Sequence, residues 1–181
     1  MDISYRLIRS SRKTLSLQIT PAGEVILRCP RRCSRQEAES FLRSKETWIR
    51  KHLESIAASP ALPVFAEAEV RALAKAAAVY FPEQVQYFAK TVGVSYGRVS
   101  IRSQRTRWGS CSGKGNLNFN CLLMLCPEAV RDYVVVHELC HRKHLNHSAE
   151  FWAEVAKHCP DYRSHKKWLK DNGASLISRL P

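Results

Sequence analysis

Three residues in the last third of the sequence have the types and spacing of a metal-dependent hydrolytic site. His137, Glu138 and His141 form the pattern H-E-x-x-H. On a helix, residues four positions apart lie on one face, so both imidazole rings can bind the same metal ion. Glu138, next to the first histidine, can then act as general base. Neutral imidazole suits zinc, and a site with three protein ligands leaves one position for a water molecule that the ion activates.

A five-residue pattern also arises by chance, and such residues can lie on a solvated helix face. The surrounding sequence favours the metal site. Three valines, residues 134–136, run directly into the pattern, and Leu139 and Cys140 continue its apolar character. This predicts a largely buried helix. Buried imidazole and carboxylate groups need partners, and a metal ion supplies one.

His147 is the leading candidate for the third ligand. It falls immediately before Ser148, a good helix N-cap, where the chain leaves one helix and turns back into another. That reversal can return the His147 ring to the metal. Glu150 and Glu154 are alternatives, because carboxylates also complete sites with two histidines. His144 is a further alternative, and it can instead bind a substrate or simply face solvent.

The elements expected to position these residues alternate between helical and extended patterns. Residues 66–92 are rich in alanine and predict a long helix, which Pro82 kinks or divides into two. After it we expect two strands of one sheet and then three helices, over residues 98–103, 116–120, 127–145, 148–158 and 162–172. Gly173 is expected to end the last helix.

The first 59 residues have a pattern of their own. Three extended runs between residues 3 and 29 predict a small antiparallel β meander. Ser34, followed three positions later by Glu37, predicts the start of a helix that ends near residue 58. Two prolines within residues 59–63 mark a linker. We therefore predict an α+β protein, with an N-terminal meander-plus-helix subdomain over residues 1–59 and a catalytic domain over residues 60–181.

The composition limits the class of protein. The chain has 181 residues, of which 45% are hydrophobic, enough for a substantial core. No run approaches the ~20 apolar residues of a membrane span, and the N-terminal segment lacks the apolar core of a signal peptide. We therefore expect a cytoplasmic protein without membrane contact. Seven cysteines, with no C-x-x-C pair, predict reduced thiols rather than a disulfide framework.

The formal net charge of +13 at pH 7 is large for this length. It favours contact with phosphate-rich partners, such as nucleic acid or nucleotides, or with acidic surfaces. Lysine and arginine are nevertheless spread along the whole chain, without a dense run, so a solvated basic surface is the alternative interpretation.

Four segments have recognisable motifs and are distributed over nearly the whole chain, at residues 12–17 (RKTLSL), 48–51 (WIRK), 107–112 (RWGSCS) and 137–152, the last of which contains the histidines. In combination they resemble the YgjP-like metallopeptidase family, relatives of the SprT-like zincins. The resemblance implies a zincin-like metallopeptidase domain. It also implies one zinc ion bound by His137, His141 and His147, with Glu138 as catalytic base.

The segment at residues 107–112 has two interpretations. In the first, which we favour, Trp108 packs in the core and the neighbouring glycines turn the chain. In the second, Arg107 lies near the metal and binds a substrate carboxylate or a developing oxyanion. Cys111 can in principle act as a fourth zinc ligand that silences the enzyme.

The function that these residues favour is hydrolysis of a peptide or protein substrate by a zinc-activated water, with Glu138 as general base. An exposed edge of the sheet over residues 98–120 can align an extended peptide. One alternative is a zinc-dependent nucleotide phosphohydrolase of the pyrophosphatase type, although neither a P-loop nor a carboxylate-rich two-metal ligand set is present in the sequence. The other is a basic nucleic-acid-binding module with a structural metal, which leaves the glutamate beside His137 without a role.

Overall fold

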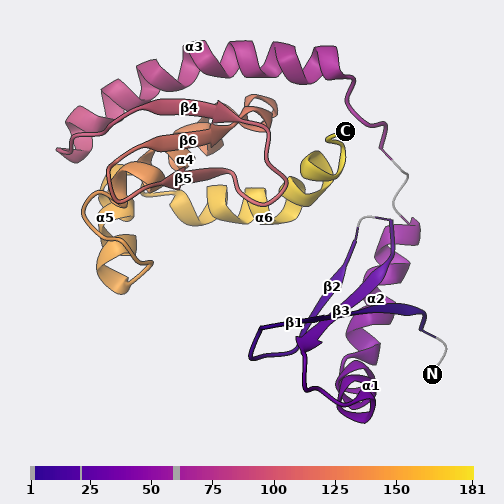
Figure 1. Ribbon diagram of the computed structural model, residues 1–181. Helices are drawn as coiled ribbons and strands as arrows, with labels where there is room; N and C mark the ends of the chain where they lie inside the picture. The colour runs from indigo at the N-terminus through magenta and orange to yellow at the C-terminus, as the bar shows by residue number, and fades with distance from the viewer. Residues whose placement is uncertain (1–2, 21, 59–61) are drawn as a thin grey trace. The chain divides into compact units, whose positions relative to one another are not determined.

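The computed structural model describes residues 3–20, 22–58 and 62–181 (Figure 1). The chain divides into two compact units, Met1–Ala61 and Leu62–Pro181, and each is described by itself. The boundary predicted at residue 59 lies outside the described residues. Both units combine a small sheet with helices, so the predicted α+β class is confirmed.

The first unit contains a three-stranded sheet and two helices, β1 (Tyr5–Ser10), β2 (Ser16–Ile19), β3 (Val25–Pro30), α1 (Arg35–Ser44) and α2 (Glu46–Ala58). Its strand order is β1-β3-β2, in which β2 is antiparallel to β3 but β1 is parallel to it. The expected antiparallel meander is therefore wrong for β1. The reason lies in β3, where Val25, Ile26 and Leu27 are all buried. A strand that is apolar on both faces takes the protected central position.

The start of α1 agrees with its sequence signature. The Ser34 side chain accepts a hydrogen bond from the Glu37 amide, and the Glu37 carboxylate accepts one from the Ser34 amide. The single helix expected here is instead two helices that meet at Lys45. At the end of α1 the Ser44 hydroxyl donates to the Phe41 carbonyl at 2.7 Å, a local bond of the kind that competes with the helical ladder.

The second unit contains a second three-stranded sheet, a 3₁₀ turn and four helices. They are α3 (Glu67–Val92), β4 (Val99–Arg102), β5 (Gly109–Cys111), β6 (Leu117–Asn120), η1 (Cys121–Leu125), α4 (Glu128–Cys140), α5 (Ala149–His158) and α6 (Tyr162–Ser178). The strand order is β4-β6-β5, with β4 parallel and β5 antiparallel to β6. In Figure 1, α3 runs along the β4 side of the sheet and α6 lies beyond β5, and α4 contacts both helices.

Two helix boundaries in this unit differ from the expectation. α3 continues through Pro82, so of the two outcomes expected there the division into two helices is wrong. α4 ends at Cys140 rather than near residue 145. α6 continues through Gly173 to Ser178, because this glycine lies against the Trp108 ring and allows close packing instead of ending the helix.

Buried Asn120, at the end of β6, fixes the loop that leads into β5. Its side-chain amide donates to the carbonyl groups of Gln104 and Arg107, at 2.7 and 3.0 Å, and its side-chain oxygen accepts from the Leu122 amide. Because Asn120 is fully buried, these bonds hold the chain just before Gly109 in one position. Across the described ranges, every helix is too short or too polar to cross a bilayer.

Candidate metal centre

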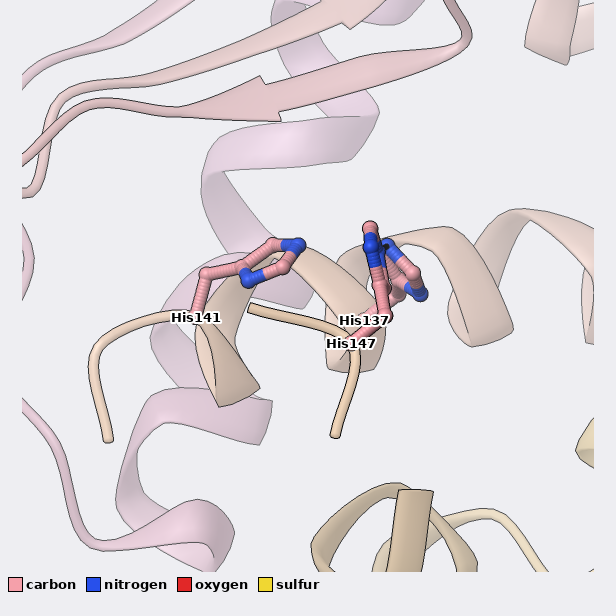
Figure 2. Close-up of side chains that lie close together, drawn as sticks. All are labelled: His137, His141 and His147. Carbon is pink, nitrogen blue, oxygen red and sulfur yellow. Dashed lines mark hydrogen bonds between the residues drawn. The ribbon is translucent and has the colours of Figure 1, made fainter. Parts of the chain in front are cut away.

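Three histidine side chains converge at the C-terminal end of α4 (Figure 2). His137 lies in the last turn of α4, His141 is its C-cap residue, and His147 lies in the loop before α5. The Nε2 atoms of His137 and His147 are 3.1 Å apart. One ring nitrogen from each of the three histidines lies within 4.8 Å of the others. The structure thus brings together the three residues that the sequence suggested as ligands.

A tight turn directly after α4 brings the three histidines together. The amide groups of Lys143 and His144 both donate hydrogen bonds to the Cys140 carbonyl, and the chain reverses direction where a longer helix was expected. His141 still has helical backbone angles, φ −64° and ψ −12°, and therefore shares a face with His137. The reversal returns His147 to the same place.

The surroundings of His137 and His147 favour neutral imidazole, the form that binds metal. Burial, together with the nearby His141 and His147, lowers the pKa of His137 to about 3. Burial also lowers the pKa of His147. Nδ1 of His141 lies 3.0 Å from the His144 carbonyl oxygen, and this contact turns its Nε2 toward the other two rings. Nδ1 of His137 is buried and has no hydrogen-bond partner among the described residues.

Phe151, from α5, lies against all three histidines. Its ring centroid is 4.5 Å from that of His141, 4.8 Å from that of His147 and 4.9 Å from that of His137. Phe151 is fully buried. An apolar side chain in this position limits the access of water and fixes the spacing of the rings.

Glu138 is 5% exposed and lies beside the histidine cluster on α4. Burial raises the pKa of Glu138 to about 8, and the charge of Arg107 acts in the opposite direction. A metal cation held by the histidines would also favour the ionised carboxylate. Gly109 of β5 lies against the Glu138 side chain, since a Cβ atom at Gly109 would be 2.6 Å from Glu138 Oε1.

The residues of the segment 107–112 have separate roles. Trp108 packs against the core and against Gly173, which supports its structural interpretation. Arg107 is exposed, and its positive charge acts to lower the pKa of Glu138. Cys111 is outside the histidine cluster, and burial, followed by the charge of Glu138, raises the pKa of its thiol.

The alternative carboxylate ligands are engaged elsewhere. Glu154 is 7% exposed, and its oxygens lie 2.6 Å from Lys143 Nζ, 3.0 Å from Lys157 Nζ and 3.2 Å from His158 Nε2. Hydrogen bonds from the two lysines are the largest causes that lower its pKa to about 2. Glu150 is exposed, and a hydrogen bond with Ser148 lowers its pKa. Among the described residues, the cluster able to hold a metal contains only the three histidines.

Two residues at the rim of the cluster were not identified from the sequence. The Trp152 ring stacks beside His147 with a centroid distance of 5.5 Å, and Lys166 Nζ lies 4.0 Å from the Trp152 centroid. The positive charge of Lys166 also contributes to the lowered pKa values of His137 and His147. Lys166 belongs to α6, so no spacing pattern connects it with α4.

Comparison with known proteins gives one family match. The model of the family described as "YgjP-like, metallopeptidase domain" matches residues 13–72 and 66–172. Two crystal structures of metallopeptidase zymogens are similar to part of the chain. Pyrococcus abyssi abylysin has 22% identity, over 50% of this chain and 93% of that one, with a TM-score of 0.46. Methanocaldococcus jannaschii jannalysin has 21% identity, over 50% and 95%, with a TM-score of 0.42. The search of curated proteins gives no match.

Proposed function

Because this chain belongs to the YgjP-like metallopeptidase family, we propose that it hydrolyses peptide bonds with one zinc ion and with Glu138 as general base. His137, His141 and His147 are the proposed ligands. The observation that carries the proposal is the convergence of three histidine side chains beside a buried glutamate.

The histidine geometry fits a tetrahedral zinc site. Two nitrogen ligands, each about 2.0–2.1 Å from a tetrahedral zinc ion, lie about 3.3–3.4 Å from each other. The separation of 3.1 Å between Nε2 of His137 and Nε2 of His147 is close to this value. The ring nitrogen of His141 is farther from the other two, within 4.8 Å of them. A small movement of the His141 side chain would bring it to the same separation. The contact of its Nδ1 with the His144 carbonyl supports Nε2 as the binding atom.

When bound, zinc supplies a Lewis acid that polarises the peptide carbonyl and makes water a better nucleophile. Glu138 accepts the proton of the attacking water and passes it to the nitrogen of the leaving amine. Its buried position beside Gly109 holds the carboxylate in one place, and Phe151 covers one side of the three rings.

Strand β5 is suited to align the peptide. It is an edge strand in the order β4-β6-β5, and its Gly109 lies next to Glu138. An extended peptide can pair with an exposed strand edge by main-chain hydrogen bonds. This pairing would place a peptide bond of the substrate beside Glu138. Such pairing recognises backbone, so it accommodates many sequences.

The test compares the zinc-loaded parent chain with Glu138→Gln, which keeps the size of the side chain but removes the base. Both proteins are incubated with unfolded casein and a peptide library, and new termini are detected by mass spectrometry. We expect the variant to keep its zinc and to lose activity by roughly 10²–10⁴-fold, the usual contribution of a general base. Parent-level hydrolysis by the variant would contradict the proposed role of Glu138. A parallel assay with nucleoside triphosphates distinguishes the alternative chemistry, since phosphate release without peptide cleavage would favour the phosphohydrolase.

A further inference from the structure

A basic hollow lies beside the metal centre, at the junction of α5 and α6. It has a volume of about 620 Å³ and is lined by Trp152, Tyr162, Arg163, Lys166, Lys167 and Lys170. All of these except Trp152 belong to α6. We refer to it as the α6 hollow.

The α6 hollow carries positive charge that is not neutralised within the described part of the chain. All four basic side chains are exposed. Lys167 forms an ion pair with Asp171, whereas no ion pair in the described ranges involves Arg163, Lys166 or Lys170. Arg163 and Lys166 contact aromatic rings, at 5.5 and 4.0 Å from the centroids. Such contacts orient a cation but leave its charge available.

A row of rings connects the hollow with the proposed metal ligands. Tyr162 stacks on Trp152 with a centroid distance of 5.2 Å and an interplanar angle of 16°. Trp152 in turn stacks beside His147. A peptide held at the histidine cluster therefore meets the α6 hollow within a few residues of the bond to be cleaved.

We propose that the α6 hollow binds acidic side chains of the peptide substrate, so that the preferred substrate is a segment with aspartate or glutamate on one side of the cleaved bond. This inference rests on the proposed peptidase function. Its physical basis is charge complementarity, which contributes to specificity and to the rate of association.

The spacing of the charges suits an extended peptide. Arg163, Lys166 or Lys167, and Lys170 recur every three or four residues, and such positions share a helix face with their Cβ atoms about 5–6 Å apart. In an extended chain, alternate side chains lie on one side about 6.7 Å apart. Alternate acidic residues can therefore each reach a different cation.

Nucleic acid is the other polymer that a basic surface attracts, and the rings of the α6 hollow argue against it. Recognition of single strands uses exposed aromatic faces on which bases stack. Here Tyr162 is 8% exposed, and Trp152 is already in contact with Lys166, His147 and Tyr162. The cations also occupy a single helix face instead of a long groove.

Binding is measured by fluorescence anisotropy with two labelled decapeptides whose termini are blocked. One has glutamate at four alternate positions, and the other has glutamine there. The protein is the zinc-loaded full chain with Glu138→Gln, so that bound peptide is not cut. We expect the glutamate peptide to bind roughly tenfold more tightly at low salt, where electrostatic contacts are least screened.

The charge reversal Lys166→Glu with Lys170→Glu should remove this preference. The matched control is Lys75→Glu with Lys90→Glu, which makes the same change of net charge at two exposed positions on α3. The control should keep the preference. Equal affinity for both peptides, or equal loss in both double variants, would overturn the proposal. So would a single-stranded oligonucleotide that displaces the peptide at lower concentration than unlabelled glutamate peptide does.

Cleavage of the two peptides by the zinc-loaded parent chain separates the two proposals. If neither peptide is cleaved but the glutamate peptide still binds more tightly through Lys166 and Lys170, the peptidase function fails and the binding site stands. If both peptides are cleaved and bound equally, the inference about the α6 hollow fails and the peptidase function stands.

Discussion

Gly109 of β5 lies directly against the carboxylate of Glu138. A Cβ atom at position 109 would be 2.6 Å from Glu138 Oε1 and 2.8 Å from its Cγ, which is closer than side-chain atoms pack. The backbone of β5 therefore sets the position of the buried carboxylate. Glycine is needed here for this close approach.

Replacing Gly109 with alanine is expected to displace Glu138 without removing a proposed zinc ligand. A displacement of about 1 Å can lower a catalytic rate by roughly 100-fold. We expect Gly109→Ala to lower kcat by about 10–100-fold for a peptide substrate while the zinc content remains that of the parent. Steady-state kinetics and metal analysis measure the two effects.

Gly113→Ala is the matched control, because a Cβ atom there meets no heavy atom within 4 Å. It should leave kcat and zinc content unchanged. Equal kcat values for Gly109→Ala and the parent chain would mean that the contact between β5 and Glu138 does not set the catalytic geometry.

The local part of the candidate site was accessible from the sequence, and the rest was not. The face shared by His137 and His141 follows from helix geometry alone, and the cap at Ser148 indicated the reversal that brings His147 back. The role of Gly109 depends on how β5 packs against α4, which no spacing in the sequence encodes. Only two strands were expected in this sheet, and β5 (Gly109–Cys111) was missed because a three-residue strand is too short to alternate visibly.

The third proposed ligand can be tested with a histidine pair. His147→Ala should strongly lower zinc occupancy, because it removes one of three converging nitrogens. His144→Ala is the control, since the contact between His144 and His141 uses the backbone carbonyl, which alanine retains. Metal analysis after dialysis against a weak chelator provides the measurement. Full occupancy in His147→Ala would assign the third position to another residue.

Stability at low pH is expected to depend on Glu154, which joins the turn after α4 to α5 through Lys143, Lys157 and His158. Its pKa is about 2 in the folded chain and about 4.3 in an unfolded one. A lowered folded pKa stabilises the native state above pH ~4.3, and this contribution is lost as the pH falls toward ~2. The expected size is about 1–3 kcal/mol, less than the full shift implies because Lys157 is largely exposed to solvent.

Glu154→Gln should therefore lower the free energy of unfolding at pH 7 by that amount, and the difference from the parent chain should disappear near pH 2. Urea denaturation at several pH values measures it. Glu83→Gln, an exposed position on α3, is the control and should differ little from the parent at any pH. A difference for Glu154→Gln that is constant with pH would mean that its ionisation is not the cause.

The fold shows the same division between local and tertiary signals. Capping predicted the start of α1 and of α5, because a cap is made by residues within one turn. The parallel pairing of β1 with β3 and the continuation of α6 through Gly173 were missed. Both depend on contacts with distant segments, in which β3 needs cover on both faces and Gly173 accommodates Trp108.

Gly173→Ala tests this interpretation of α6 through the sign of its effect on stability. At an unobstructed helix position, alanine in place of glycine stabilises by about 0.4–1 kcal/mol. At Gly173 a Cβ atom would lie 2.9 Å from Cζ2 of Trp108, so we expect destabilisation of about 1–3 kcal/mol, as in other overpacked cores. The same substitution in a Trp108→Leu background should cost less, because the obstructing ring is absent. Urea denaturation of the four proteins gives the coupling, and a stabilising Gly173→Ala would show that this glycine is not required for packing.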